Sequence, residues 1–177
     1  MPKITLVNSE NKELVEEIKK YLSNKGLEFV IATDTISLEN YDSDSLIIYT
    51  TFDKIETNHN ANTKILRIHP SLLPAFDTNN AIAEAYKNVK VTGVTIIENQ
   101  YEREKILAQY PVLIGLTTSY CDLEEEIKTI SKKLYPVVID AVISDRVFDF
   151  VDLFKGGCHS GGSTCGGSCG NCSKCSN

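Results

Sequence analysis

The sequence contains no apolar run that approaches the roughly 20 residues needed to cross a bilayer. Its first residues, MPKITLVNSENKEL, also lack the long apolar stretch of a secretory signal peptide. These two absences argue against a membrane-spanning protein and against a secreted one. We therefore expect a cytoplasmic protein.

The sequence is also poor in positive charge. It has 18 Lys and Arg residues against 24 Asp and Glu residues, which gives a formal net charge of −6. Nucleic acids and anionic membranes attract proteins mainly through an excess of basic side chains. We therefore expect neither nucleic acid nor membrane as a partner.

Cysteine is rare until the end of the chain. Cys121 stands alone near an expected helix start, where we expect it to be a small structural residue. The other five cysteines crowd the last 20 residues with the spacing C-x6-C-x3-C-x2-C-x2-C, and they are Cys158, Cys165, Cys169, Cys172 and Cys175. Without a secretory signal, such crowding indicates a metal or cluster site rather than disulfides.

Three states of these cysteines are compatible with their spacing. Cys165, Cys169 and Cys172 have the C-x3-C-x2-C spacing of some iron–sulfur clusters, with Cys175 or Cys158 as a fourth ligand. A zinc ion held by Cys169, Cys172, Cys175 and one more thiolate fits equally well. The third alternative is an unligated tail with reduced thiols.

The composition changes abruptly after residue 154. Residues 155–177 hold seven of the ten glycines of the chain and no large apolar side chain. A segment of this kind cannot bury enough surface to fold alone. We therefore expect a folded domain over residues 1–154 and a flexible tail rich in Gly and Cys over residues 155–177.

Short apolar runs alternate with amphipathic segments through the folded part. The patterns predict strands at 3–7, 27–33, 45–52, 64–69, 89–98 and 105–114, and helices at 9–26, 80–88 and 122–144. Asp122 is expected to cap the last helix and Pro136 to kink it. Strands separated by helices, followed by an antiparallel pair, indicate an α/β fold of three layers with a mixed, mostly parallel sheet.

The stretch KILRIHPSLLPAF, residues 64–76, places a histidine where a strand becomes a loop. Ile65, Leu66 and Ile68 favour a strand, and the prolines that follow cannot continue it. His69 therefore lies where parallel α/β sheets bind their ligands.

These residues resemble the folate-dependent formyltransferases. IHPSLLPAF, followed by VTGVTI, by ILAQYPV and by a helix ending KKLYPVVIDAVISDRVF, is similar in order and spacing to the glycinamide ribonucleotide formyltransferase branch. The resemblance covers about half the chain. It implies a Rossmann-like, three-layer α/β/α sandwich and formyl transfer from 10-formyltetrahydrofolate to an amine, phosphoribosylglycinamide in this branch of purine biosynthesis.

The family surrounds the formyl carbonyl with Asn, His and Asp side chains, and this sequence keeps the histidine alone. His69 matches the family histidine, Arg67 stands where the Asn belongs, and Glu102 matches the Asp. The resemblance implies that His69 acts as donor and proton relay, Glu102 as its acid/base partner and Arg67 as donor to the oxyanion. Arg67 has a second interpretation, in which it pairs with Glu102 or Glu104.

The folate site matches the family pattern better than the site for the amine substrate does. TTFDKIE, residues 50–56, matches the turn that contacts the folate, and this implies that Phe52, Asp53, Lys54 and Ile55 bind it. After the first strand the family has a glycine-rich phosphate loop, and this sequence has VNSENKEL with no glycine. Small-molecule folate and amine are the partners that the resemblance implies. The alternative is a binding protein that has lost catalysis and whose tail holds a metal or an Fe–S cluster.

Overall fold

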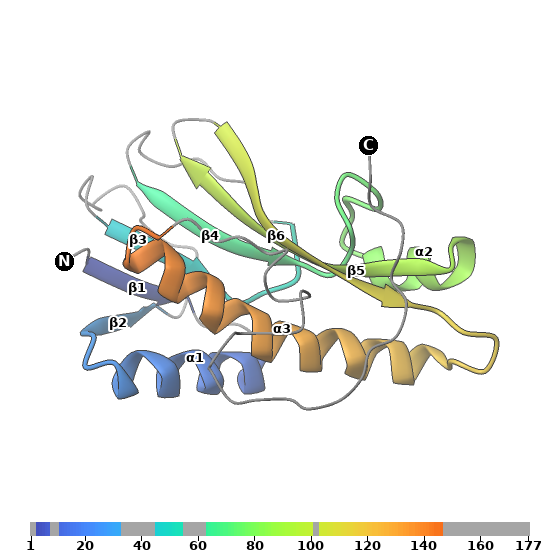
Figure 1. The fold of residues 1–177 in the computed structure, drawn as a ribbon, viewed down its shortest axis with the longest axis horizontal. Coiled ribbons are helices and arrows are strands. Elements are labelled where there is room, and N and C mark those ends of the chain that lie inside the picture. The colour runs from blue at the N-terminus through green and yellow to red at the C-terminus, as the bar shows by residue number, and fades with distance from the viewer. Residues whose placement is uncertain (1–2, 8–10, 33–44, 55–62, 101–102, 147–177) are drawn as a thin grey trace, which may run out of the picture.

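The structure, a computed structural model, describes residues 3–7, 11–32, 45–54, 63–100 and 103–146 (Figure 1). The elements within these residues are β1 (Lys3–Val7), α1 (Lys12–Asn24), β2 (Phe29–Ala32), β3 (Ser45–Tyr49), β4 (Lys64–His69), α2 (Ala81–Asn88), β5 (Val91–Gln100), β6 (Arg103–Leu113) and α3 (Tyr120–Ile143). The order of strands and helices expected from the sequence is confirmed, with ends displaced by a few residues.

The strands form one mixed sheet in the order β2-β1-β3-β4-β5-β6. The first four run parallel to one another, and β5 and β6 are antiparallel additions beside β4 (Figure 1). The expected hairpin of β5 and β6 is present and is longer than the sequence indicated. The predicted mixed, mostly parallel sheet is therefore confirmed.

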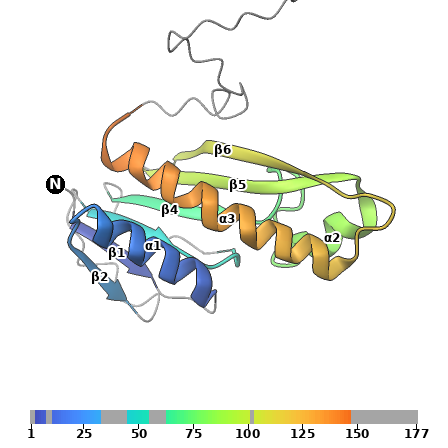
Figure 2. The ribbon, with the colours of Figure 1, turned by 60° about the horizontal axis from the view of Figure 1, so that its bottom comes forward.

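Helices α1 and α3 pack side by side against one face of the sheet (Figure 2). The apolar stripe of α1 is buried there, at Leu14, Val15, Ile18 and Leu22. Tyr135 of α3 is fully buried, and its hydroxyl donates to the carbonyl oxygen of Tyr49 at the end of β3, 2.8 Å away. This hydrogen bond ties the helix layer to the carboxyl end of a parallel strand.

A second, smaller apolar cluster lies on the opposite face of the sheet. Its residues are Val7, Ile47, Tyr49 and Ile65. All three described helices instead contribute side chains to the main core, including Ile82 and Tyr86 of α2. The described residues thus supply one helical layer, and the second helical layer of the predicted sandwich stays a prediction.

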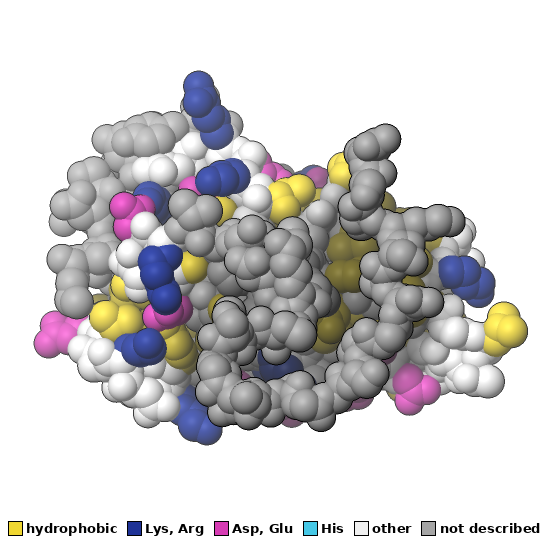
Figure 3. Space-filling view, viewed as in Figure 1, with side chains coloured by type: hydrophobic (Ala, Val, Ile, Leu, Met, Phe, Trp, Pro, Cys, Tyr) yellow, Lys and Arg dark blue, Asp and Glu magenta, His cyan; other side chains and the backbone are white. Residues whose placement is uncertain are grey.

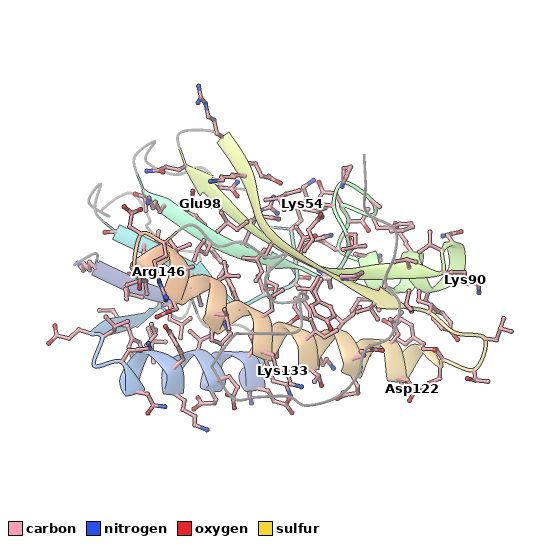
Figure 4. The ribbon with its side chains drawn as sticks, viewed as in Figure 1. Lys54, Lys90, Glu98, Asp122, Lys133 and Arg146 are labelled. Carbon is pink, nitrogen blue, oxygen red and sulfur yellow. The ribbon has the colours of Figure 1, made fainter. Side chains whose placement is uncertain are left out.

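The start of α3 differs from the expected one. Ser119 is the N-cap, and its side chain accepts a hydrogen bond from the backbone N–H of Asp122, while the Asp122 carboxylate accepts from the backbone N–H of Ser119. Asp122 therefore completes a capping box in the first turn, where Figure 4 labels it, rather than acting as the cap itself. The helix continues through Pro136 to Ile143.

Candidate active site

β4 ends at His69, at the edge where the parallel strands present their carboxyl ends. Ile65, Leu66 and Ile68 are buried and make β4 an inner strand, and Pro70 follows at once with no N–H to continue the ladder. His69 itself is 1% exposed. Among the described residues, no histidine is visible on the face shown in Figure 3. The sequence placed His69 correctly at the strand end, and the structure adds that it is buried.

The imidazole of His69 is held by the loop that follows it. Its Nε2 atom lies 3.0 Å from the carbonyl oxygen of Phe76. Phe76 has a φ of 55°, a left-handed conformation that bulky side chains rarely adopt. The backbone N–H of Thr78 donates to the same oxygen at 2.8 Å. Residues 70–76 therefore fold back onto the histidine.

The surroundings of His69 favour its neutral form. Burial lowers the pKa of His69 below its ordinary value of 6.5, and the positive charges of Arg67 and Lys54 act in the same direction. The carbonyl of Phe76 and the charge of Asp77 oppose this shift. The imidazole is therefore neutral at pH 7 and has a lone pair that can accept a proton.

Two polar side chains missed by the sequence reasoning lie beside His69 in the sheet. Thr95 of β5 is opposite His69, and Gln109 of β6 is opposite Thr95. Because directly opposed side chains in neighbouring strands point to the same face, the three residues line one face at one level. Nothing in the local pattern distinguishes them, since strands of a half-buried sheet often carry Thr and Gln.

Arg67 is 8% exposed and engages two side chains. One terminal nitrogen lies 2.6 Å from a carboxylate oxygen of Glu104, and Nε donates to the side-chain oxygen of Asn99 at 3.3 Å. The second terminal nitrogen has no hydrogen-bond partner among the described residues. The interpretation in which Arg67 pairs with Glu104 is thus the arrangement that the structure has.

This pairing directs the guanidinium toward Asn99 and Glu104, while its charge still lowers the pKa of His69. Asn99 and Glu104 are opposite each other, and Asn99 is opposite Ile65 rather than Arg67. Thr95, at the level of His69, is four residues from Asn99, which is about 13 Å along a strand. Glu102 lies outside the described residues, between the paired Gln100 and Arg103 that close the described hairpin. Of the three predicted catalytic residues, the structure describes His69 and Arg67.

We expect Glu104→Gln to lower the free energy of unfolding by about 1–2 kcal/mol, because it leaves the buried guanidinium without its anionic partner. The loss stays below that of a fully buried pair since the Glu104 side chain is 45% exposed. Urea denaturation of Glu104→Gln, Arg67→Met and the double variant measures the coupling. Glu98→Gln is the matched control, since it removes the same charge from β5, where no ion pair of Glu98 is described. Additive losses in the double variant would contradict the pairing.

Residues 37–139 match the family described as Formyl transferase. The matched segment is more than half of the 177-residue chain and includes His69, Thr95 and Gln109. The chain belongs to the formyl transferase family.

Curated relatives support the branch that the sequence resembled. The chain is 35% identical over 83 residues to the phosphoribosylglycinamide formyltransferase of Bacillus subtilis, covering 45% of this chain and 43% of that protein. It is 34% identical over 89 residues to the human trifunctional purine biosynthetic protein adenosine-3, covering 49% of this chain and 9% of that protein. The sequence matches therefore span less than half of these curated relatives.

A solved structure shares the fold over a longer stretch. The crystal structure of phosphoribosylglycinamide formyltransferase from Bacillus halodurans has a TM-score of 0.62 and 20% identity, and the match covers 83% of this chain and 100% of that one. The resemblance to the folate-dependent formyltransferases and the Rossmann-like α/β fold are thus confirmed.

The loop after β3, where the formyltransferase resemblance implies folate contacts, is held by one of its own side chains and by two side chains of the segment before α2. The backbone N–H of Asp53 donates to Thr51 Oγ1 at 3.1 Å, and that of Lys54 to the side-chain oxygen of Asn79 at 2.8 Å. Lys54, labelled in Figure 4, also forms a 2.7 Å ion pair with Asp77. Two backbone donors of this loop are therefore already used.

Of the other two residues implied in folate binding, the structure describes only Phe52. Phe52 is half-buried and packs against the main core. Ile55 lies outside the described residues. Folate binding by Phe52, Asp53, Lys54 and Ile55 stays a prediction.

The predicted metal ligands, Cys158, Cys165, Cys169, Cys172 and Cys175, also lie outside the described residues. In the part of the chain that the structure does describe, no three His, Cys, Asp or Glu side chains are grouped as a metal site would require. Cys121 is a free thiol in the first turn of α3 and is exposed, rather than packed as a structural residue. No described helix is long and apolar enough to cross a membrane.

Proposed function

We propose that this chain transfers the formyl group of 10-formyltetrahydrofolate to an amine. The observation that carries the proposal is the buried, neutral His69 at the carboxyl end of β4, inside the segment that matches the formyl transferase family. A neutral imidazole held in place beside a ligand-binding edge is suited to moving a proton during acyl transfer. The name of the Bacillus subtilis relative, phosphoribosylglycinamide formyltransferase, supports phosphoribosylglycinamide as the class of acceptor.

The reaction makes one bond and breaks one bond at the formyl carbon. The amine nitrogen attacks this carbon, the bond to N10 of the folate breaks, and one proton passes from the amine to N10. His69 relays this proton, with Glu102 as its acid/base partner. Arg67 stabilises the tetrahedral oxyanion through the terminal nitrogen that Glu104 does not occupy.

The proposed role has further parts that come from the sequence alone. The chain acts in the cytoplasm, in one-carbon metabolism and purine biosynthesis, as a domain over residues 1–154. The tail over residues 155–177 carries a metal or an Fe–S cluster on its five cysteines. Purification without oxygen, followed by metal analysis and an absorption spectrum, tests the tail. A metal-free, colourless protein after reconstitution would reject this part without affecting the rest.

One observation favours a second candidate function, a binding protein of the same fold without catalysis. Arg67 occupies the position of the family Asn and is paired with Glu104 at 2.6 Å. This pair directs the guanidinium toward Glu104 and leaves one of its terminal nitrogens without a partner among the described residues. Such a protein would retain the folate site and lose turnover.

Turnover of 10-formyltetrahydrofolate separates the two functions. We expect the wild-type chain to form a formylated product with phosphoribosylglycinamide, because His69 supplies the proton relay. The assay also includes other primary amines and water alone, since release of formate without an amine would indicate a hydrolase. Arg67→Asn, which restores the family residue, is expected to raise the rate. Folate binding with no turnover in either protein would leave the binding protein, and absence of both binding and turnover would reject both functions.

A further inference from the structure

Thr95 and Gln109 fasten the loop that holds His69. The Thr95 hydroxyl donates to the carbonyl oxygen of Ser71 at 2.6 Å and accepts from the backbone N–H of Leu73 at 3.1 Å. The side-chain amide of Gln109 donates to the carbonyl oxygen of Leu73 at 2.8 Å and to the Thr95 hydroxyl at 3.2 Å. We call these two side chains, with the backbone of residues 71–73, the loop clamp.

The hydroxyl of Thr95 uses its full hydrogen-bonding capacity in the loop clamp. A threonine hydroxyl has one hydrogen to donate and two lone pairs to accept with. Its hydrogen goes to Ser71, and its lone pairs accept from Leu73 and Gln109. Thr95 is fully buried, so no water replaces these partners at low cost. These hydrogen bonds hold residues 71–73 against β5 and β6.

Further contacts connect the loop clamp to the imidazole of His69. Ser71 donates its side-chain hydrogen to the carbonyl oxygen of Ala75 at 2.6 Å, and the next residue, Phe76, has the left-handed conformation described above. The carbonyl of Phe76 faces Nε2 of His69 at 3.0 Å. Since a carbonyl oxygen can only accept, the neutral imidazole carries its hydrogen on Nε2. Its lone pair is then on Nδ1, which has no hydrogen-bond partner among the described residues.

We propose that Thr95 and Gln109 are positioning residues that fix His69 as the tautomer with hydrogen on Nε2, so that Nδ1 is the atom that accepts the proton of the attacking amine. In the neutral state His69 then serves as a base and not as a donor to the oxyanion. Nδ1 takes one proton from the amine, and the imidazolium returns one proton to N10 of the folate. The part of this inference that concerns the reaction rests on the proposed function.

Nitrogen NMR of the imidazoles tests the tautomer without any substrate. The chain has three histidines, His59, His69 and His159, and the spectrum of His69→Gln identifies the signals of His69. We expect a pyridine-like Nδ1 and a protonated Nε2 in the wild-type protein at pH 7. A protonated Nδ1 in the neutral ring would overturn the proposal.

Variants of Thr95 test the loop clamp. Thr95→Val removes the hydroxyl at nearly constant volume, and we expect a mixture of His69 tautomers. The pKa of His69 should also rise toward 6.5 as the loop loosens and water reaches the ring. Asp77, Arg67 and Lys54 are the charged groups near His69, and they are unchanged in this variant. Thr95→Ser restores the hydroxyl and is expected to restore the wild-type spectrum.

Two more variants exclude a general effect on stability. Thr92 is buried on the same strand, and its hydroxyl has no hydrogen-bond partner among the described residues, so Thr92→Val should leave the signals of His69 unchanged. Gln109→Met keeps the length of the side chain without its donors and should shift His69 in the same direction as Thr95→Val. A wild-type His69 spectrum in both Thr95→Val and Gln109→Met would overturn the loop clamp.

Kinetics then connect the loop clamp to the reaction. We expect Thr95→Val to lower kcat about 10-fold to 100-fold with little change in KM, and Thr95→Ser to recover most of the rate. If the wild-type chain shows no turnover but has the expected tautomer, the proposed function fails and the loop clamp stands. If turnover occurs with His69 in the other tautomer, the proposed function stands and this inference fails.

Discussion

His69→Gln is expected to lower kcat for formyl transfer about 10³-fold, the typical contribution of a positioned acid/base group. Glutamine can still donate to the carbonyl oxygen of Phe76, because its amide nitrogen reaches about as far as Nε2 of histidine. It cannot accept and return a proton. The substitution therefore removes the proton relay and keeps the contact with Phe76 that orders the loop. Steady-state kinetics with 10-formyltetrahydrofolate and the acceptor amine measure the loss.

The pH dependence of the wild-type chain provides an independent check. Because burial lowers the pKa of His69, the imidazole stays neutral as the pH falls to 6.5, and the acid limb of kcat/KM should lie below that value.

The free energy of unfolding should also decrease as the pH falls. The unfolded chain binds a proton at His69 more readily, so this contribution to folding is present above pH 6.5 and is lost as the pH falls through the folded pKa. If the His69→Gln variant retained the wild-type rate, the proposed role of His69 in proton transfer would be wrong.

Gly93→Ala is expected to cost more than about 3 kcal/mol of folding free energy, or to prevent folding, because its side chain has no space. A Cβ atom at this position of β5 would lie 2.0 Å from the carbonyl oxygen of Tyr110 on β6 and 2.8 Å from a methyl carbon of Leu72. The first contact would push the paired strands apart. The second falls on the end of a flexible side chain of the loop that holds His69, so it costs less than the first.

Gly115→Ala is the matched control for this substitution. Its Cβ would meet only the Thr118 hydroxyl, at 3.3 Å, within the described structure. Both substitutions lower the entropy of the unfolded chain by the same amount, so their difference isolates the contacts at residue 93. Urea denaturation measures the two free energies of unfolding. Equal stabilities would mean that β5 and β6 are not as close as described at this point.

The local pattern of the sequence was sufficient to predict most of the sheet. Runs such as KITLV and SLIIY are buried throughout or nearly so, and they lie in the parallel half of the sheet as such runs predict. Proline after His69 fixed the end of β4. The N-cap of α3 is Ser119, three residues before the predicted Asp122, because both are good capping residues and the sequence offers both sides of a capping box.

The candidate site was harder to predict because its contacts join distant segments. The ion pair of Arg67 with Glu104 spans 37 residues, and the bond from Gln109 to Leu73 spans 36. Each depends on the register of β4, β5 and β6, which the periodicity of a single strand does not contain. The sequence could offer Glu102 and Glu104 as alternative partners of Arg67. It could not choose between them.

The two outermost strands of the described sheet also affect how the protein behaves at high concentration. A sheet edge has backbone groups that can pair with another chain and start aggregation. β2 is only four residues long, and β6 begins with exposed Arg103, Glu104 and Lys105 and has Pro111 near its other end. Charges, proline and short length all disfavour the addition of a strand. We therefore expect Glu104 to disfavour strand addition at this edge, apart from any part that Arg67 takes in the reaction.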